Sequence, residues 1–476
     1  MQFLFNNKKS FYLFFLIIFI IHQLIFQNNL VFDNYLIAED YKSTIPNLVF
    51  GKIWFMKNHL FEAPHFAAHL CGGTPFYADP QSLYYSLIQI VFILFDVIFS
   101  IKLTFFIFSF LTYLGSYYLL KESFKFNNYI SLIGATLFLF NGFFVNRVLV
   151  GHLSYMYLGL IPLYCLIVIK SYENSNFYLR VLIIIISSLL LTMLMYGGAL
   201  PLVIIIIYSI VSIILLYSIK YNNNKIFLNL SYSLILTFLL SISKIVYSLN
   251  YIINFPRNID GIILKNFFNF IYTFLTSLFL VPDPIYYHQN EYNINKVYIY
   301  LHELEYGVSI LPLLLIVYYL FFFRKKMLIE YKIFKFNIQY ILLIILLILP
   351  ISFQIFIPYV SNLLDKIPFF SSIWVRARWL YIYIFPIIFL TCLIIDRIKL
   401  KKIFIIFLIF IPIAQTLSYH TARNYFFPDK SFAKKATYNV ENLSKFSNYL
   451  SKKNIDGIKI TKVEYDSDFT KMDLNE

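Results

Sequence analysis

Long apolar runs recur along almost the whole chain, and they decide what it can fold into. Many of them extend over about 17 residues or more, which is enough for a helix to cross a hydrocarbon layer of about 30 Å. The sequence is 60% hydrophobic and only 13% charged, whereas soluble domains are about 45–50% apolar and about 25% charged. Helices of a soluble protein would alternate apolar and polar faces instead. The sequence therefore predicts an all-α, polytopic membrane protein.

Short basic clusters between the apolar runs predict the topology. The net charge of +15 comes largely from these clusters, which are typical of topology signals rather than of a nucleic-acid-binding surface. The apolar stretch after Lys8 and Lys9 has no small-residue cleavage site, so we interpret it as an uncleaved first span. With these lysines in the cytoplasm, about eleven spans place every short basic cluster on the cytoplasmic side. The expected spans are residues 10–31, 99–120, 128–146, 153–170, 180–196, 200–219, 228–250, 306–323, 337–358, 374–396 and 402–419.

This count divides the chain into a transmembrane bundle, residues 1–419, and an extracytoplasmic tail, residues 420–476. Two long outer loops are expected at 32–98 and 251–305. Within the first, the apolar spacing of residues 41–58 predicts an amphipathic helix on the membrane surface. Segments 82–99 and 266–281 are apolar enough that the sequence leaves open whether they cross the membrane.

Three carboxylates follow the first span closely: Asp33, Glu39 and Asp40. A carboxylate just outside a membrane helix is often a solvated loop residue. It could also act as a general base that takes a proton from a hydroxyl at the membrane boundary. The residue types alone do not rank the three.

The same loop contains His65 and then a stretch rich in glycine and proline, residues 71–82. Such a composition fixes a sharply turned backbone. The stretch could be a simple connector, but Asp79 and Gln81 on a rigid turn would also suit substrate positioning.

Cations stand at the predicted outer ends of several spans. Arg147 and His152 lie at the end of the third span, and Arg376 and Arg378 open the tenth. Such side chains either extend to the interface or pair with an anion. The guanidinium fork matches phosphate oxygens, so these residues are candidates to bind a lipid phosphate. Lys244 lies inside the seventh apolar run, where an ionisable group is a candidate functional residue.

Glu303 and Glu305 stand directly before the eighth span and could support the same outer site. The sequence contains no phosphate-binding P-loop, no Rossmann glycine fingerprint and no HExxH zinc motif. A cytosolic nucleotide-driven activity is therefore not supported, and the need for a metal stays open.

The long first outer loop with an early acidic residue resembles the GT-C superfamily of membrane glycosyltransferases. More specifically, the chain resembles the YfhO-type bacterial membrane proteins. The first matching segment contains Glu39 and Asp40 with Pro46, followed by Gly-Gly-Thr-Pro-Phe at 72–76 and Asp-Pro-Gln-Ser at 79–82, and the last two motifs are its most specific part. Three weaker segments follow in the same order: Gly-His-Leu-Ser at 151–154, Glu303 to Gly307, and Pro-Phe-Phe at 368–370 with Arg-Ala-Arg at 376–378.

The resemblance implies an inverting transfer of a sugar from a polyprenyl-phosphate donor to an envelope glycan or lipid outside a bacterial cytoplasmic (inner) membrane. It makes Asp40 the catalytic base and assigns the leaving lipid phosphate to Arg376 and Arg378, assisted by Arg147 or His152. It also implies that Asp79, Gln81 and Glu303 hold sugar hydroxyls. Some members of the superfamily use a divalent metal, which no ligand cluster here demands.

A transporter or flippase of a lipid-linked glycan is the alternative. Transporters usually place polar residues and broken helices near the bilayer midplane, often in repeated halves. The midplane runs here are nearly featureless, as at residues 182–191, and the polar residues gather outside. The sequence therefore favours the glycosyltransferase, while the sugar, the acceptor and the oligomeric state stay open.

Overall fold

The computed structural model describes residues 8–27, 29–33, 36–37, 40–59, 62–67, 73–255, 267–280, 303–322, 338–354, 366, 376–400 and 402–426, and the structure is given for these residues.

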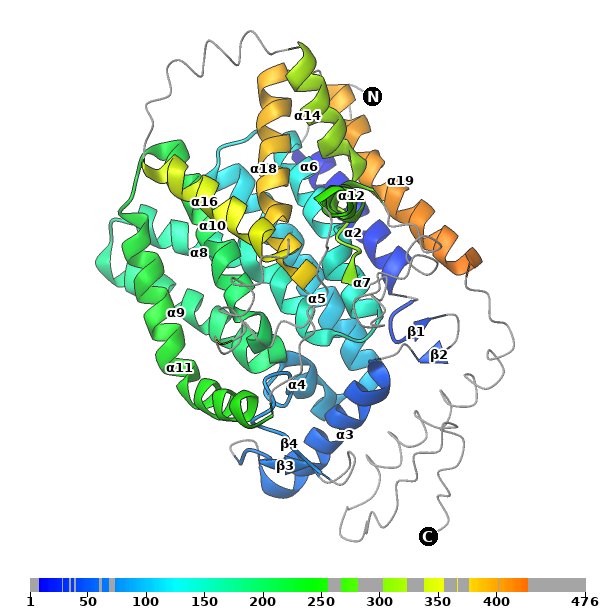
Figure 1. Ribbon diagram of the computed structural model, residues 1–476, viewed down its shortest axis with the longest axis vertical. Helices are drawn as coiled ribbons and strands as arrows, with labels where there is room; N and C mark the ends of the chain where they lie inside the picture. The colour runs from blue at the N-terminus through cyan, green and yellow to red at the C-terminus, as the bar shows by residue number, and fades with distance from the viewer. Residues whose placement is uncertain are drawn as a thin grey trace.

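The described chain folds into a bundle of apolar helices (Figure 1). The α-helices are α2 (Lys8–Phe26), α3 (Tyr41–Asn58), α4 (Leu87–Leu94), α5 (Val97–Tyr118), α6 (Asn128–Leu139), α7 (Gly142–Leu149), α8 (Ile161–Glu173), α9 (Phe177–Leu194), α10 (Val203–Tyr221), α11 (Ile226–Asn254), α12 (Phe267–Phe279), α14 (Ile310–Phe322), α16 (Ile338–Gln354), α18 (Tyr381–Ile398) and α19 (Lys402–Phe426). Shorter turns of tighter or wider helix are η1 (Leu119–Ser123), η2 (Leu153–Leu160), η3 (Met195–Ala199), η4 (Leu200–Leu202) and η6 (Arg376–Leu380).

Two small antiparallel hairpins complete the described structure. Strand β1 (Phe32–Asp33) pairs with β2 (Leu36–Ile37), with Phe32 opposite Ile37. Strand β3 (Phe66–Ala67) pairs with β4 (Thr74–Pro75), with Phe66 opposite Pro75. Both hairpins and α3 lie toward the lower end of the bundle in Figure 1, while α2 begins at the upper end. The predicted topology makes the lower end extracytoplasmic.

Seven helical stretches of the described residues are long and apolar enough to cross a membrane, which confirms a membrane-type helical bundle. The longest of them, Phe177–Tyr221, contains two of the predicted spans. The chain departs from helical geometry between them at Gly197 and Gly198. Three shorter apolar helices occur where further spans are predicted: Ile310–Phe322, Gln339–Pro350 and Phe404–Tyr419. The count of eleven spans and the side on which each terminus lies stay predictions.

Polar side chains begin several of the apolar helices. The Asn127 side chain accepts hydrogen bonds from the backbone N–H groups of Tyr129 and Ile130 at the start of α6. Asp96 and Asn141 cap α5 and α7 in the same way. A capping side chain satisfies backbone donors that the first turn of a helix leaves open. These residues therefore define where the chain enters each helix.

Helix α6 lies in the centre of the bundle, and every residue from Tyr129 to Leu139 is buried. Small residues allow its neighbours to approach closely. A Cβ atom at Gly134 would come within 2.3 Å of the Leu120 side chain and 2.7 Å of the Cys392 sulfur. Close approach at small residues is a common way for membrane helices to pack, because the lipid gives no hydrophobic force between them.

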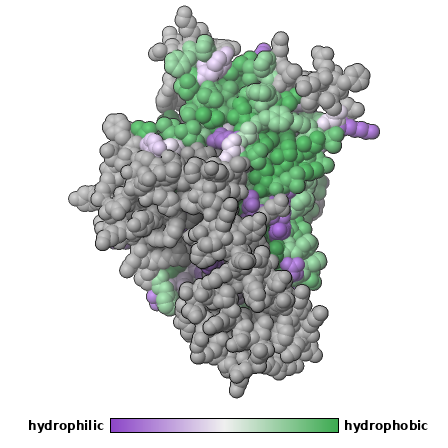
Figure 2. Space-filling model, turned by 90° about the vertical axis from the view of Figure 1, so that its right-hand side faces the viewer, coloured by the Kyte–Doolittle hydropathy of each residue, from purple (hydrophilic) through white to green (hydrophobic). Residues whose placement is uncertain are grey.

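Large apolar side chains cover the outside of the bundle. Figure 2 shows a continuous apolar surface on the upper part of the face that lies to the right in Figure 1. Exposed leucine, isoleucine and phenylalanine side chains also line α2, α9, α11 and α16. A soluble protein rarely exposes such a surface, so hydrocarbon is its expected environment.

Helix α3 covers Tyr41–Asn58, where the sequence predicts an amphipathic helix, and it buries one face through Tyr41, Ile45 and Leu48. The place of this helix on the outer membrane surface stays a prediction. The apolar segments 82–99 and 266–281 contain α4 and α12, of 8 and 13 residues. At about 1.5 Å per residue, both helices are shorter than the hydrocarbon layer is thick. Of the predicted tail, residues 427–476 lie outside the described residues.

Candidate functional site

Asp40 stands directly before α3, and its backbone is tied to the end of α7. The Asp40 N–H donates to the Val150 carbonyl at 3.0 Å, and the Tyr41 hydroxyl donates to the Val148 carbonyl at 2.8 Å. Gly151 makes this approach feasible. Its φ is +104°, and a Cβ atom there would lie 2.5 Å from the Tyr41 nitrogen. A side chain at position 151 would therefore push α3 away.

The Asp40 carboxylate meets the His152 ring next to this glycine. His152 Nε2 contacts Asp40 Oδ2, and Nδ1 of the same ring lies 3.5 Å from the Arg147 guanidinium. Arginine only donates and a carboxylate only accepts. A neutral ring with its proton on Nε2 satisfies both neighbours, since it accepts from Arg147 and donates to Asp40.

The electrostatics of His152 agree with a neutral ring. Burial lowers the pKa of His152, and the positive charge of Arg147 lowers it further. The hydrogen bond and charge of Asp40 oppose this change, but the pKa stays below its ordinary value. The Asp40 side chain itself is 43% exposed. The structure thus places a solvent-accessible carboxylate beside a half-buried hydrogen-bond donor, since 18% of the His152 side chain is exposed.

Glu303 bridges two arginines from distant parts of the chain. Arg147 donates to Glu303 Oε2 at 2.5 Å. Arg378 donates to both carboxylate oxygens, at 3.1 Å from Nε and 2.6 Å from a terminal nitrogen. The exposed fractions of the three side chains are only 0%, 5% and 8% for Arg147, Glu303 and Arg378. This is a buried ion cluster with one carboxylate between two guanidinium groups.

Glu303 is ionised in this setting. Burial alone would raise its pKa, but the charges and hydrogen bonds of Arg147 and Arg378 outweigh burial and hold the pKa of Glu303 well below its ordinary value. A buried carboxylate with two strong charge-assisted partners is the expected anionic form.

Tyr155 connects the ion cluster to the Asp40–His152 pair. Its ring stacks on His152 with centroids 5.2 Å apart. The Arg147 and Arg378 guanidinium carbons lie 5.1 and 5.8 Å from the ring centroid, which is typical of cation–π contacts. Asp40, His152, Tyr155, Arg147, Glu303 and Arg378 therefore form one contiguous group, which we call the outer charge cluster after the side of the membrane predicted for it.

The Gly/Pro-rich loop, residues 71–82, is anchored by hydrogen bonds to α11. Lys244 of α11 donates to the backbone carbonyls of Tyr77 and Asp79, at 2.6 and 2.7 Å. The Asp79 carboxylate accepts from the Gln81 N–H at 2.9 Å, which closes a local turn. Lys244 is 1% exposed. Its two hydrogen bonds to loop carbonyls therefore explain why a cation lies inside this apolar run.

The described part of this loop packs against the second half of α3 and against α11. Phe76 packs against Phe50 in the second half of α3, with ring centroids 5.0 Å apart, whereas Asp40 precedes the first turn of that helix. About ten helical residues correspond to about 15 Å. Gln81 and His65 are exposed. The contacts seen for Asp79, Gln81 and His65, the three residues predicted to position substrate, are within the loop and with Lys244 and Tyr247 of α11.

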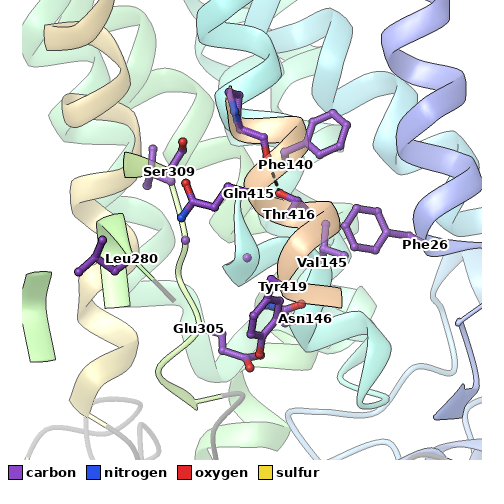
Figure 3. Close-up of a pocket in the computed structure, with 14 residues that line it drawn as sticks. Phe26, Phe140, Val145, Asn146, Leu280, Glu305, Ser309, Gln415, Thr416 and Tyr419 are labelled. Atoms are coloured by element: carbon purple, nitrogen blue, oxygen red, sulfur yellow. Dashed lines mark hydrogen bonds between the residues drawn. The ribbon is translucent and has the colours of Figure 1, made fainter. Parts of the chain in front are cut away.

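Glu305 faces a different environment from Glu303. It lines a cavity of about 40 Å³ together with Asn146, Ser309, Gln415 and Tyr419 (Figure 3). Gln415 fixes one wall, because it accepts from the Ile310 N–H at 2.8 Å and donates to the Phe279 carbonyl at 3.1 Å. The cavity is roomy enough for water, and it lies beside α7, next to the cluster.

Some predicted site residues, or their side chains, are not among those that the structure describes. Glu39 is not among the described residues, and the side chains of Asp33 and Arg376 are not described. Asp33 is placed only by its backbone, in β1. Among the described residues, no group of three or more His, Cys, Asp or Glu side chains gathers as metal ligands would. The structure therefore brings together Asp40, His152, Arg147, Glu303 and Arg378 from the predicted set.

Sequence reasoning missed Tyr155 and the bridging role of Glu303. Tyr155 lies three residues after His152, a spacing that can place two side chains side by side on a helical turn. No comparable signal exists for Glu303, because its partners are 156 and 75 residues away along the chain.

Comparison with known proteins gives no further assignment. No protein-family model matches the chain, and no curated protein or solved structure is significantly similar to it.

Proposed function

We propose that the chain is a membrane glycosyltransferase that moves a sugar from a polyprenyl-phosphate donor to an acceptor outside the cytoplasmic membrane. The observation that carries the proposal is the outer charge cluster: an accessible carboxylate, Asp40, beside two buried guanidinium groups at one end of a membrane-type bundle. This combination matches the chemistry that glycosyl transfer from a lipid phosphate requires.

Asp40 would act as the general base. It takes the proton of the acceptor hydroxyl as the acceptor oxygen attacks the anomeric carbon, and the bond from that carbon to the phosphate oxygen breaks. A single displacement inverts the anomeric configuration. His152, neutral and hydrogen-bonded to Asp40, would hold the carboxylate in place rather than compete for the proton.

Arg147 and Arg378 would stabilise the negative charge that develops on the leaving phosphate, because fixed cations in a poorly solvated site interact strongly with such charge. Glu303 holds both guanidinium groups in position. A phosphate or a sugar hydroxyl would have to share these groups with Glu303, so the proposal assigns Glu303 mainly to orienting the arginines. The contributions of Arg376, Glu39 and Asp33 stay predictions.

A transporter or flippase of a lipid-linked glycan is the second candidate. The observation that favours it is the burial of Arg147, Glu303 and Arg378, since buried charges in membrane helices often mark a transport path. The cluster lies next to the accessible Asp40, which favours chemistry at one face over passage through the bundle.

Proteoliposomes that contain a labelled polyprenyl-phosphate sugar and a glycan acceptor distinguish the two candidates. The transferase predicts label in the acceptor, and the transporter predicts movement of intact donor between leaflets without a new glycosidic bond. Movement without transfer, across a range of donors and acceptors, would overturn the proposal.

A further inference from the structure

A groove runs along the lipid-facing surface between α2 and α5. It has a volume of about 320 Å³, and its walls include Ile20 and Leu24 of α2 and Phe106 and Phe110 of α5. Its floor is aromatic, because the Phe19 ring packs against the Phe106 and Phe110 rings at 5.2 and 5.3 Å. Both helices are membrane-type spans. Hydrocarbon is therefore the natural occupant.

The lining of the groove becomes polar toward the end of α2. Gln23 and Gln27 line it there. The Gln27 amide donates to the Gln23 side chain at 2.9 Å and to the Lys102 carbonyl at 3.0 Å. An apolar channel that ends in amide groups matches a lipid, whose chain is apolar and whose ester and phosphate region is polar.

Lys102 supplies a cation at the same end. Lys102, Phe106 and Phe110 are spaced four residues apart on α5, so they share one face of the helix. Lys102 is partly exposed and makes no ion pair among the described residues. It lies about 8 Å from the start of α5 at Val97, by the helical rise, which is a depth from which a lysine can reach lipid headgroups.

We propose that this groove is a binding site for an anionic phospholipid of the extracytoplasmic leaflet. One acyl chain lies along Ile20, Leu24, Phe106 and Phe110, and the phosphate lies at the Lys102 ammonium group. Lys102 is predicted to be on the outer side, away from the short basic clusters that set the topology, and a lipid phosphate neutralises it there. The site does not depend on the proposed transferase activity.

The test is native mass spectrometry of the full-length protein, delipidated and then titrated with phosphatidylglycerol or phosphatidylcholine. We expect one saturable phosphatidylglycerol site. Lys102→Gln should weaken it about five-fold, the effect of one lysine near a lipid phosphate, with little change for phosphatidylcholine. Ile20→Trp should fill the groove and remove the site for both lipids.

Two matched controls keep the test specific. Leu13→Trp adds the same ring to α2 at an exposed position outside the groove lining. Lys57→Gln removes an exposed lysine from the last turn of α3. Both should bind phosphatidylglycerol as the wild type does. The proposal is overturned if the wild type has no preference for phosphatidylglycerol, if Lys102→Gln behaves as Lys57→Gln does, or if a polyprenyl phosphate displaces phosphatidylglycerol at equimolar concentration.

Discussion

Replacing Glu303 by glutamine should destabilise the protein strongly without changing its shape. The substitution keeps the side-chain volume but removes the only negative charge seen between Arg147 and Arg378 in the described cluster, where three hydrogen bonds from these arginines meet. Breaking a buried ion pair by removing one partner costs about 3–5 kcal/mol, because the remaining charge stays buried without compensation. Here two guanidinium groups, those of Arg147 and Arg378, would lose their compensating charge.

This cost should appear as a lower melting temperature. Unfolding entropy is about 2.1 cal/mol/K per residue, which gives about 1 kcal/mol/K for the 476 residues. A loss of about 4 kcal/mol then lowers the midpoint by about 4 °C. Helices that persist in detergent reduce the unfolding entropy, so the shift should be larger still. The measurement is thermal unfolding of the purified protein in detergent, followed by size-exclusion or intrinsic fluorescence.

Glu173→Gln is the matched control. Glu173 pairs with Lys170 at 2.8 Å, but both side chains are partly exposed, and such surface pairs contribute about 0–1 kcal/mol. The pKa of Glu303 lies well below its ordinary value. Its contribution is therefore complete above pH about 4.5 and is lost only at more acidic pH. A Glu303→Gln protein as stable as Glu173→Gln at neutral pH would refute the buried-cluster reasoning.

Three further predictions concern the surroundings of the cluster and the loop. The pKa of His152 is lowered, so the unfolded state binds more protons and wild-type stability should fall as pH drops below about 6.5; in unfolding curves at several pH values, His152→Asn should flatten this slope. Gly151→Ala should displace Asp40 because its Cβ would meet the Tyr41 nitrogen at 2.5 Å, so the variant should lose more than ten-fold in sugar transfer, and full activity would contradict the close approach. Lys244→Met should loosen the Gly/Pro-rich loop by removing two charge-assisted hydrogen bonds, each worth about 1.5–3 kcal/mol. A cysteine placed at the buried Ser82, with Cys71 replaced by serine, should then react with a maleimide faster than the same cysteine does when Lys244 is present. Equal rates would contradict the role of Lys244 in holding the loop.

The helical framework was predictable because helices that cross the hydrocarbon layer need long apolar runs. Such runs are visible in the sequence without knowledge of tertiary contacts. The amphipathic spacing of α3 was predictable for the same reason, since it depends on neighbours within one helix. Arg147, Glu303 and Arg378 could also be singled out one by one, because a charge at the end of an apolar run is conspicuous.

The arrangement of these charges was not predictable. Glu303 and Arg147 are 156 residues apart, so their contact depends on how α7, η6 and the segment before α14 pack. Lys244 illustrates the same limit, since its partners are backbone carbonyls and these carry no sequence signal. The periodicity of apolar residues predicts individual helices. The site instead depends on contacts between distant segments, such as the close approach of α3 to the end of α7 that Gly151 permits.

The most direct test of the proposed base compares wild type and Asp40→Asn in single-turnover transfer of labelled sugar from a polyprenyl-phosphate donor. The amide cannot accept the acceptor proton, yet it is nearly isosteric with the carboxylate. Asp96→Asn serves as the control, because Asp96 caps α5 at an exposed position. The account predicts a loss of at least about 100-fold for Asp40→Asn, the usual contribution of a general base, with normal folding and near-normal transfer in Asp96→Asn. Equal transfer by wild type and Asp40→Asn would contradict the central claim.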